Sequence, residues 1–219
     1  GYISGHAPWS NAYESILFVS WAAMGMGLLF ARKSELTLAA SAFVTFMLLW
    51  IAHQSWVDPS IANLVPVLDS YWVMIHVPII VGSYGPFTVS MILGMVALLL
   101  MILTTKKNKK RMDINIKELT IINELAMTVG LIMLTIGNFL GGQWANESWG
   151  RYWGWDPKET WALLTWLIYM LYIHFRHHRP NKINPAMWIL AVSFAVLLIC
   201  WFGINYLPSA QNSVHVYGS

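Results

Sequence analysis

Tryptophan is concentrated in the segment Gly141–Trp161, which contains five of the 13 Trp residues of the chain. Indole rings stack on flat apolar molecules, and glycines between the rings allow a ligand to come close to the backbone. The segment therefore fits a large flat ligand with negatively charged edges, which indole N–H groups, Arg151 or Lys158 would bind. Haem has this chemistry, but anchoring at a membrane interface, or a lipid or quinone site, fits the same residues. The Trp residues are Trp144, Trp149, Trp153, Trp155 and Trp161.

Histidines form the second group of candidates, because a neutral imidazole is a good ligand for iron. Of the seven in the chain, His76 and His215 lie near helix ends on the side expected for the Trp-rich segment. Two neutral imidazoles on opposite faces of a haem iron would make a six-coordinate site. His6 and His53 share this side, but neither matches a motif that assigns it a role, so we rank them lower.

His174 is a separate candidate, because it lies at the inner end of an expected membrane-spanning helix. An ionisable side chain is costly in a bilayer, and one found there is a functional candidate by default. The neighbouring His177 and His178 lie between Arg176 and Arg179. We interpret them as part of a solvated turn.

The end of the Trp-rich segment has the pattern of a helix start. Asp156 has the residue type of an N-cap, Pro157 suits the first helical position, and Glu159 can reach back to the cap. We interpret both carboxylates mainly as a cap. A helix capped here would also orient the aromatic rings that precede it.

Helices must position these residues, and the composition places the helices in a bilayer. The chain is 57% hydrophobic and 11% charged, against about 25% charged in soluble domains. Apolar runs recur that are close to the ~20 residues needed to cross the hydrocarbon core. The sequence predicts an all-α polytopic membrane protein of about six transmembrane helices with an external Trp-rich loop. The predicted spans are Ser15–Ala31, Leu36–Ala52, Phe87–Leu103, Ile121–Leu140, Trp161–Phe175 and Ala186–Tyr206.

Basic residues follow the first, third and fifth spans, and these three loops hold 11 of the 13 Lys and Arg residues. The positive-inside rule assigns such loops to the cytoplasm, and the Trp-rich segment, Val57–Tyr84 and both termini to the outer side. We interpret the run Lys106–Arg111 as a topology signal and expect no nucleic-acid partner.

The remaining segments complete the expected organisation. Thr104–Lys117 is linker-like, and the Pro and Gly residues of Val57–Tyr84 predict short helical pieces at the membrane surface. Cys200 is the single cysteine of the chain, so we assign it to packing. We expect residues 1–219 to form one membrane domain that is a piece of a longer chain.

The run Trp149–Trp161 closely resembles the tryptophan-rich WWD signature of the haem-handling protein superfamily. Its continuation Asp156-Pro157-Lys158-Glu159-Thr160-Trp161 resembles the CcsA branch, the system II cytochrome c synthases, in which CcsA can form the C-terminal part of a CcsBA fusion. Residues 5–15, Tyr71–Pro78 and Ser83–Gly85 also match. The resemblance covers nearly the whole chain.

The resemblance implies transport of haem b across the bacterial inner membrane and its attachment to the Cys-x-x-Cys-His motif of apocytochrome c by two thioether bonds. His76 and His215 would bind the iron on the periplasmic side, and His174 would hold haem at an inner transmembrane site. A CcsB-like half would supply the second inner histidine, and a thiol-reducing system would keep the cysteines reduced. The implied haem-binding residues of the WWD segment are Trp144, Trp149, Arg151, Tyr152, Trp153, Trp155, Asp156 and Trp161.

Addition of a thiol to a vinyl group requires placement more than acid–base chemistry, so we expect this holocytochrome c synthase, or haem lyase, to act by orientation. A haem transporter or chaperone that forms no bond is the alternative within the superfamily. A membrane anchor whose Trp residues only mark the interface is the alternative outside it.

Overall fold

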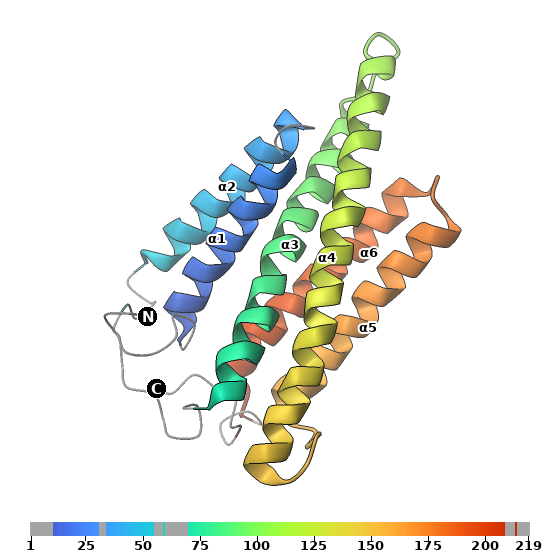
Figure 1. Cartoon of the computed structure of the whole chain (residues 1–219). Coiled ribbons are helices and arrows are strands. Elements are labelled where there is room, and N and C mark those ends of the chain that lie inside the picture. The colour runs from blue at the N-terminus through green and yellow to red at the C-terminus, as the bar shows by residue number, and fades with distance from the viewer. Residues whose placement is uncertain (1–10, 31–33, 55–58, 60–69, 209–212, 214–219) are drawn as a thin grey trace.

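The computed structural model describes residues 11–30, 34–54, 59, 70–208 and 213, and the elements in this part of the chain are helices (Figure 1). Five of them are long and apolar enough to cross a membrane, and α5, which contains the remaining predicted span, is not among these five. The predicted all-α polytopic fold is confirmed. The helices are α1 (Ala12–Phe30), α2 (Glu35–Ala52), α3 (Tyr71–Ile102), α4 (Lys109–Trp149), α5 (Pro157–His178), α6 (Ile183–Trp201) and the short 3-10 helix η2 (Gly203–Tyr206).

Helix α3 begins at Tyr71, well before the predicted third span. The expected short surface pieces over residues 71–84 are therefore wrong, because Pro78 and Pro86 lie inside one continuous helix. Every residue from 81 to 90 is buried. Backbone groups buried in a membrane protein need internal partners, and a continuous helix supplies them despite the two prolines.

Helix α4 is unbroken over 41 residues, which makes it about 60 Å long, or roughly twice the thickness of the hydrocarbon core. It includes the second half of the predicted linker, so only residues 103–108 connect α3 to α4. It also includes the first part of the Trp-rich segment. The expected loop is therefore reduced to residues 150–156, which start at Gly150 with a φ of 68°, a left-handed conformation that ends helices.

Glycines of α4 receive large side chains of α3. A methyl group added at Gly130 would lie 2.7 Å from the Phe87 ring, and one at Gly137 would lie 2.6 Å from Ile80. One at Gly141 would lie 2.5 Å from the His76 ring. The three pairs follow each other at intervals of four and seven residues on both helices, which is the spacing of one helix face. Small residues thus bring the two backbones into close contact between residues 76–87 of α3 and 130–141 of α4.

A buried hydrogen-bond network attaches α5 to this hairpin. The Tyr172 hydroxyl donates to Asn123 Oδ1 at 2.6 Å, and Asn123 Nδ2 donates to the Ser90 carbonyl oxygen at 2.6 Å. One turn further along α5, the Arg176 guanidinium pairs with the Glu124 carboxylate. Polar groups inside a membrane protein need such partners, and these bonds set the position of α5 against α3 and α4.

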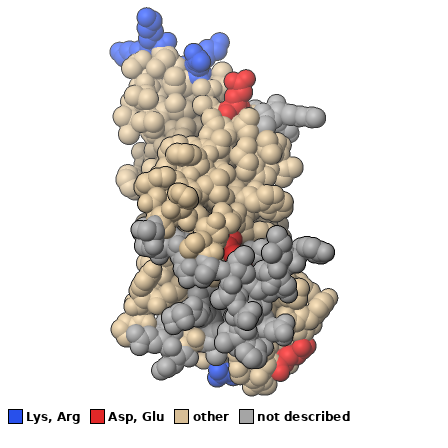
Figure 2. All heavy atoms as spheres, turned by 90° about the vertical axis from the view of Figure 1, so that its left-hand side faces the viewer, with Lys and Arg blue, Asp and Glu red and all other residues tan. Residues whose placement is uncertain are grey.

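Charged side chains lie mainly at the ends of the bundle. The turn between α3 and α4 and the turn between α5 and α6 lie at one end, and residues 150–156 lie at the other (Figure 1). Figure 2 shows Lys and Arg side chains above a broad band of uncharged surface, at the end of the α3–α4 turn. Two of the three basic loops that the sequence groups together therefore lie at one end of the bundle, and the third, with Arg32 and Lys33, lies outside the described residues.

Candidate functional site

His76 lies in the second turn of α3, and its ring is fixed against α4. The Nδ1 atom is 2.8 Å from the carbonyl oxygen of Gly137. Because a carbonyl oxygen only accepts, Nδ1 carries the proton and Nε2 carries the lone pair. Gly141 makes this approach possible, since any side chain there would collide with the ring. A histidine whose Nδ1–H is bonded to a backbone carbonyl has the tautomer and orientation of a typical metal ligand.

Two Trp side chains of α4 form a chain of ring contacts with His76. Trp144 is stacked with His76 at 6.2 Å between ring centroids, with an angle of 21° between the planes. Trp149 meets Trp144 edge to face at 4.8 Å and 73°. Trp144 is 2% exposed, so it supports the other two rings from inside the bundle.

Residues 150–156 form a tight turn that presents aromatic rings to the outside. The Arg151 guanidinium covers Gly154, where an added methyl group would lie 2.7 Å from its central carbon. Trp153 and Trp155 meet edge to face at 5.8 Å and 88°. Both are exposed, Trp155 to 70%, and so is the neighbouring Tyr152. The turn thus presents two exposed aromatic rings, perpendicular to each other, next to a guanidinium group.

Trp155 has a φ of 57°, and among the described residues it is the one non-glycine residue in the left-handed region. This conformation costs about 1–2 kcal/mol for a residue with a Cβ. The Glu159 carboxylate lies where it can offset that cost: Oε2 accepts from Gly154 N at 2.8 Å and from Asp156 N at 3.1 Å. Hydrogen bonds to a charged group contribute about 1.5–3 kcal/mol each, which is sufficient to hold the turn.

Asp156 is the N-cap of α5, as the sequence predicts, and the capping box with Glu159 is complete. The Asp156 carboxylate accepts from Lys158 N at 3.1 Å. It also accepts from the Ser213 hydroxyl at 2.7 Å. The cap therefore holds a residue 57 positions further along the chain, two residues before His215.

Lys158 follows the cap and precedes the predicted fifth span. Burial lowers the pKa of Lys158 from 10.5 to about 8, against the smaller raising effects of Cys200 and Asp156. At neutral pH the side chain is still mostly protonated. It is a second cation, after Arg151, at this end of the bundle.

The structure brings some of the sequence-predicted residues together and separates others. His76, Trp144 and Trp149 form one group of contacting rings, and the turn with Trp153 and Trp155 follows it along the chain. Trp161 lies partly buried in the first turns of α5. His215 and His6 lie outside the described residues, and His53 is the exposed C-cap of α2.

His174 lies far from this group, near the other end of α5 and about 25 Å along the helix from Pro157. It is exposed. Its ring is 4.2 Å from that of His178, one turn further on. His174 and His76 therefore belong to opposite ends of the bundle.

Sequence reasoning missed three contributors to the site: Gly137, Gly141 and Ser213. The two glycines are four residues apart on α4, and this small-residue spacing is a known signal for close helix packing. Nothing in the sequence indicates which α3 residue they face. The Ser213 contact depends on the tertiary fold and has no local signal.

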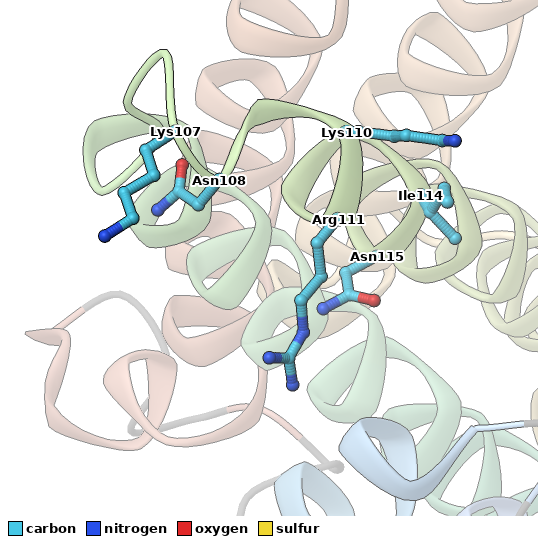
Figure 3. A pocket seen from close by; sticks show the side chains of 6 residues that line it. All are labelled: Lys107, Asn108, Lys110, Arg111, Ile114 and Asn115. Atoms are coloured by element: carbon cyan, nitrogen blue, oxygen red, sulfur yellow. The ribbon is translucent and has the colours of Figure 1, made fainter.

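A shallow pocket at the opposite end of the molecule is a poor alternative site. It is lined by Lys107, Lys110 and Arg111 together with Asn108, Ile114 and Asn115. Figure 3 shows that its three cationic side chains point in different directions. They do not converge on a common ligand position.

Comparison with known proteins gives one consistent result. Residues 9–210 match the protein family described as Cytochrome C assembly protein. Protein NrfI of Wolinella succinogenes is 48% identical over 213 residues, which are 97% of this chain and 24% of that protein.

CcsA proteins, named as cytochrome c biogenesis proteins, are similar over almost the whole chain. The CcsA protein of Chlamydomonas reinhardtii is 36% identical over 98% of this chain and 62% of its own length. That of Prochlorococcus marinus is 35% identical over 98% of this chain and 77% of its own length. The chain thus spans about a quarter of NrfI and less than two thirds of the algal CcsA protein.

Proposed function

Since the chain belongs to the cytochrome c assembly protein family, we propose that it binds haem b at the Trp-rich end of the bundle and attaches it to apocytochrome c. The observation that carries the proposal is the contact of His76 Nδ1 with the Gly137 carbonyl oxygen at 2.8 Å. It leaves the lone pair on Nε2, which is the form of imidazole that binds iron. A haem site needs such a ligand in a fixed orientation, and the buried Trp144 is stacked on the same ring and supports it.

Each group at this end has a role in the proposal. His76 binds the iron from one face, and His215 binds it from the other. The exposed ring of Trp155 stacks on the macrocycle, and Trp153 supports that ring edge to face. The Arg151 guanidinium and the Lys158 ammonium group pair with the carboxylates at its edge. Tyr152, Asp156, Trp149 and Trp161 complete the proposed binding segment.

The proposed reaction adds the S–H bond of each substrate cysteine across a vinyl group of haem. Sulfur bonds to one vinyl carbon and hydrogen to the other, so no electrons are gained or lost overall. The residues of this chain therefore act by holding the two reactants in the productive orientation. The histidine of the Cys-x-x-Cys-His motif displaces His76 or His215 from the iron, which loosens the site and lets the product leave.

The wider assembly is part of the same proposal. The Trp-rich end faces the periplasm from the bacterial inner membrane, and the basic loops face the cytoplasm, in keeping with the positive-inside rule. Residues 1–219 form one domain of a longer system, in which a CcsB-like portion supplies a histidine to pair with His174. A thiol-reducing system keeps the substrate cysteines free.

Co-expression of the full-length protein with an apocytochrome c tests the proposal. We expect haem that stays on the cytochrome after denaturation, and its loss in His76→Ala. The matched control is His53→Ala, which removes an exposed histidine outside the ring group. Haem that binds the protein but is never attached to the cytochrome would indicate a transporter. A protein that stays colourless when haem is supplied would exclude both activities.

A further inference from the structure

The left-handed backbone of Trp155 has no explanation in the packing of its own side chain. A bulky residue at positive φ is uncommon, and it persists where the surroundings impose it. The indole is 70% exposed, so burial of the ring does not hold the backbone in place. Its one ring contact in the described part of the chain is the edge-to-face contact with Trp153, which is itself exposed.

The constraint comes from Glu159. Its Oε2 atom accepts from the N–H group before Trp155 and from the N–H group after it. A single oxygen atom that binds both neighbours draws the two peptide planes together, and the residue between them must turn outward. The capping box needs only the bond to Asp156 N, so the additional bond from Gly154 N goes beyond capping.

We propose that Glu159 is the positioning residue of the Trp-rich segment, because it holds Trp155 in the conformation in which its indole is presented to the face of haem. This inference rests on the proposed function and assigns one residue within it. Glu159 does not touch haem itself. It acts through Trp155, and Trp155 serves as an exposed stacking surface whose direction is set before haem arrives.

The first test needs no haem. In the full-length protein, Glu159→Ala should increase amide hydrogen exchange at Gly154 and Asp156, and shift the ¹⁹F resonance of 5-fluorotryptophan at position 155. Glu159→Gln keeps one acceptor oxygen and should retain most of the native signal. Glu147→Ala is the matched control, because it removes an exposed carboxylate from the same end of the bundle.

The second test measures haem affinity in a double-mutant cycle. Trp155→Ala and Glu159→Ala should weaken haem binding by similar factors, about tenfold each, and the double variant should be no weaker than Trp155→Ala alone. A role limited to capping α5 would give additive losses instead. It would also increase exchange in the first turns of α5, where Asp156→Ala provides the comparison.

Failure of the positioning role of Glu159 can be distinguished from failure of haem binding at Trp155. Unchanged exchange and an unchanged ¹⁹F resonance in Glu159→Ala would overturn the positioning role, whether or not haem binds. Faster amide exchange in Glu159→Ala, combined with full haem affinity in Trp155→Ala, would overturn the use of Trp155 as a haem surface. Three results together would support the proposal: faster amide exchange in Glu159→Ala, equal losses of haem affinity in the two single variants, and no further loss in the double variant.

Discussion

The imidazole of His76 and the carbonyl group of Gly137 are joined by a hydrogen bond of 2.8 Å between α3 and α4. This bond fixes which nitrogen of the ring is protonated and prevents rotation about the side-chain bonds. The candidate ligand is thus held by the helix pair, while the exposed aromatic rings at the same end of the bundle are presented by a seven-residue turn.

The first prediction concerns the space for the His76 ring. Gly141→Ala should displace the ring, since the new methyl group would lie 2.5 Å from it, and should weaken haem binding about 10- to 100-fold, as loss of ligand orientation does. The Soret band of the purified protein checks this. Gly25→Ala is the control, because nothing lies within 4 Å of its added methyl group. Equal affinity in both variants would contradict the assigned role of Gly141.

The second prediction concerns the Asp156–Ser213 contact. Asp156→Ala removes both the cap and the acceptor for the Ser213 hydroxyl, so it should destabilise the protein by about 1 kcal/mol and increase amide exchange near residue 213. Ser213→Ala should increase exchange there without affecting the start of α5. Asp156→Asn keeps an acceptor oxygen and should behave like the unmodified protein. Equal exchange near residue 213 in all three variants would show that the contact does not hold this segment.

The third prediction concerns the buried network. Tyr172→Phe removes the donor to Asn123 Oδ1 and should lower stability by about 0.5–2 kcal/mol, as measured for hydrogen bonds between membrane helices. Thermal unfolding in detergent measures the loss. Tyr71→Phe, which removes an exposed hydroxyl at the start of α3, should have no effect. A Tyr172→Phe protein as stable as Tyr71→Phe would mean that the network does not stabilise the bundle.

The fourth prediction concerns Lys158. Its pKa of about 8 in the folded protein lies below the ordinary value of 10.5, so the unfolded chain binds more protons between these values. Stability should therefore rise as pH increases from about 8 to 10.5, and change little from this source below pH 8. Lys158→Met should remove this part of the pH dependence, whereas Lys182→Met, at an exposed position, should keep it. Identical pH profiles for the two variants would refute the assignment.

The fold was predictable in outline because each span is long and apolar, and because the cap of α5 has a local sequence pattern. The start of α3 was not, since Pro78 and Pro86 argue against a helix locally, yet both lie inside one continuous helix whose continuously buried part begins only at residue 81. The length of α4 was missed because its first turns are polar. Its polar first turns resemble a linker in composition, and they become helical because they continue a long packed helix.

The candidate site was predictable by residue type but not by geometry. The sequence identifies His76 and the Trp-rich segment as candidates, and it predicts the capping role of Asp156 and Glu159. It cannot show that the His76 ring lies over Gly141. It also gives no sign that Trp155 has a positive φ, because that conformation depends on a second hydrogen bond that the capping pattern does not require.

The pairing of α3 side chains with α4 glycines also limits how the two helices can move. Phe87, Ile80 and His76 each occupy the space above one glycine, so a slide of one helix past the other would remove all three from their places at once. A shift by one turn, about 5.4 Å, would set Phe87 against Leu134 or Ala126 instead of a glycine. The contacts between α3 and α4 therefore fix the position of His76 along the bundle axis. We expect conformational changes at the candidate site to occur in the turn at residues 150–156 instead of by sliding of the helices.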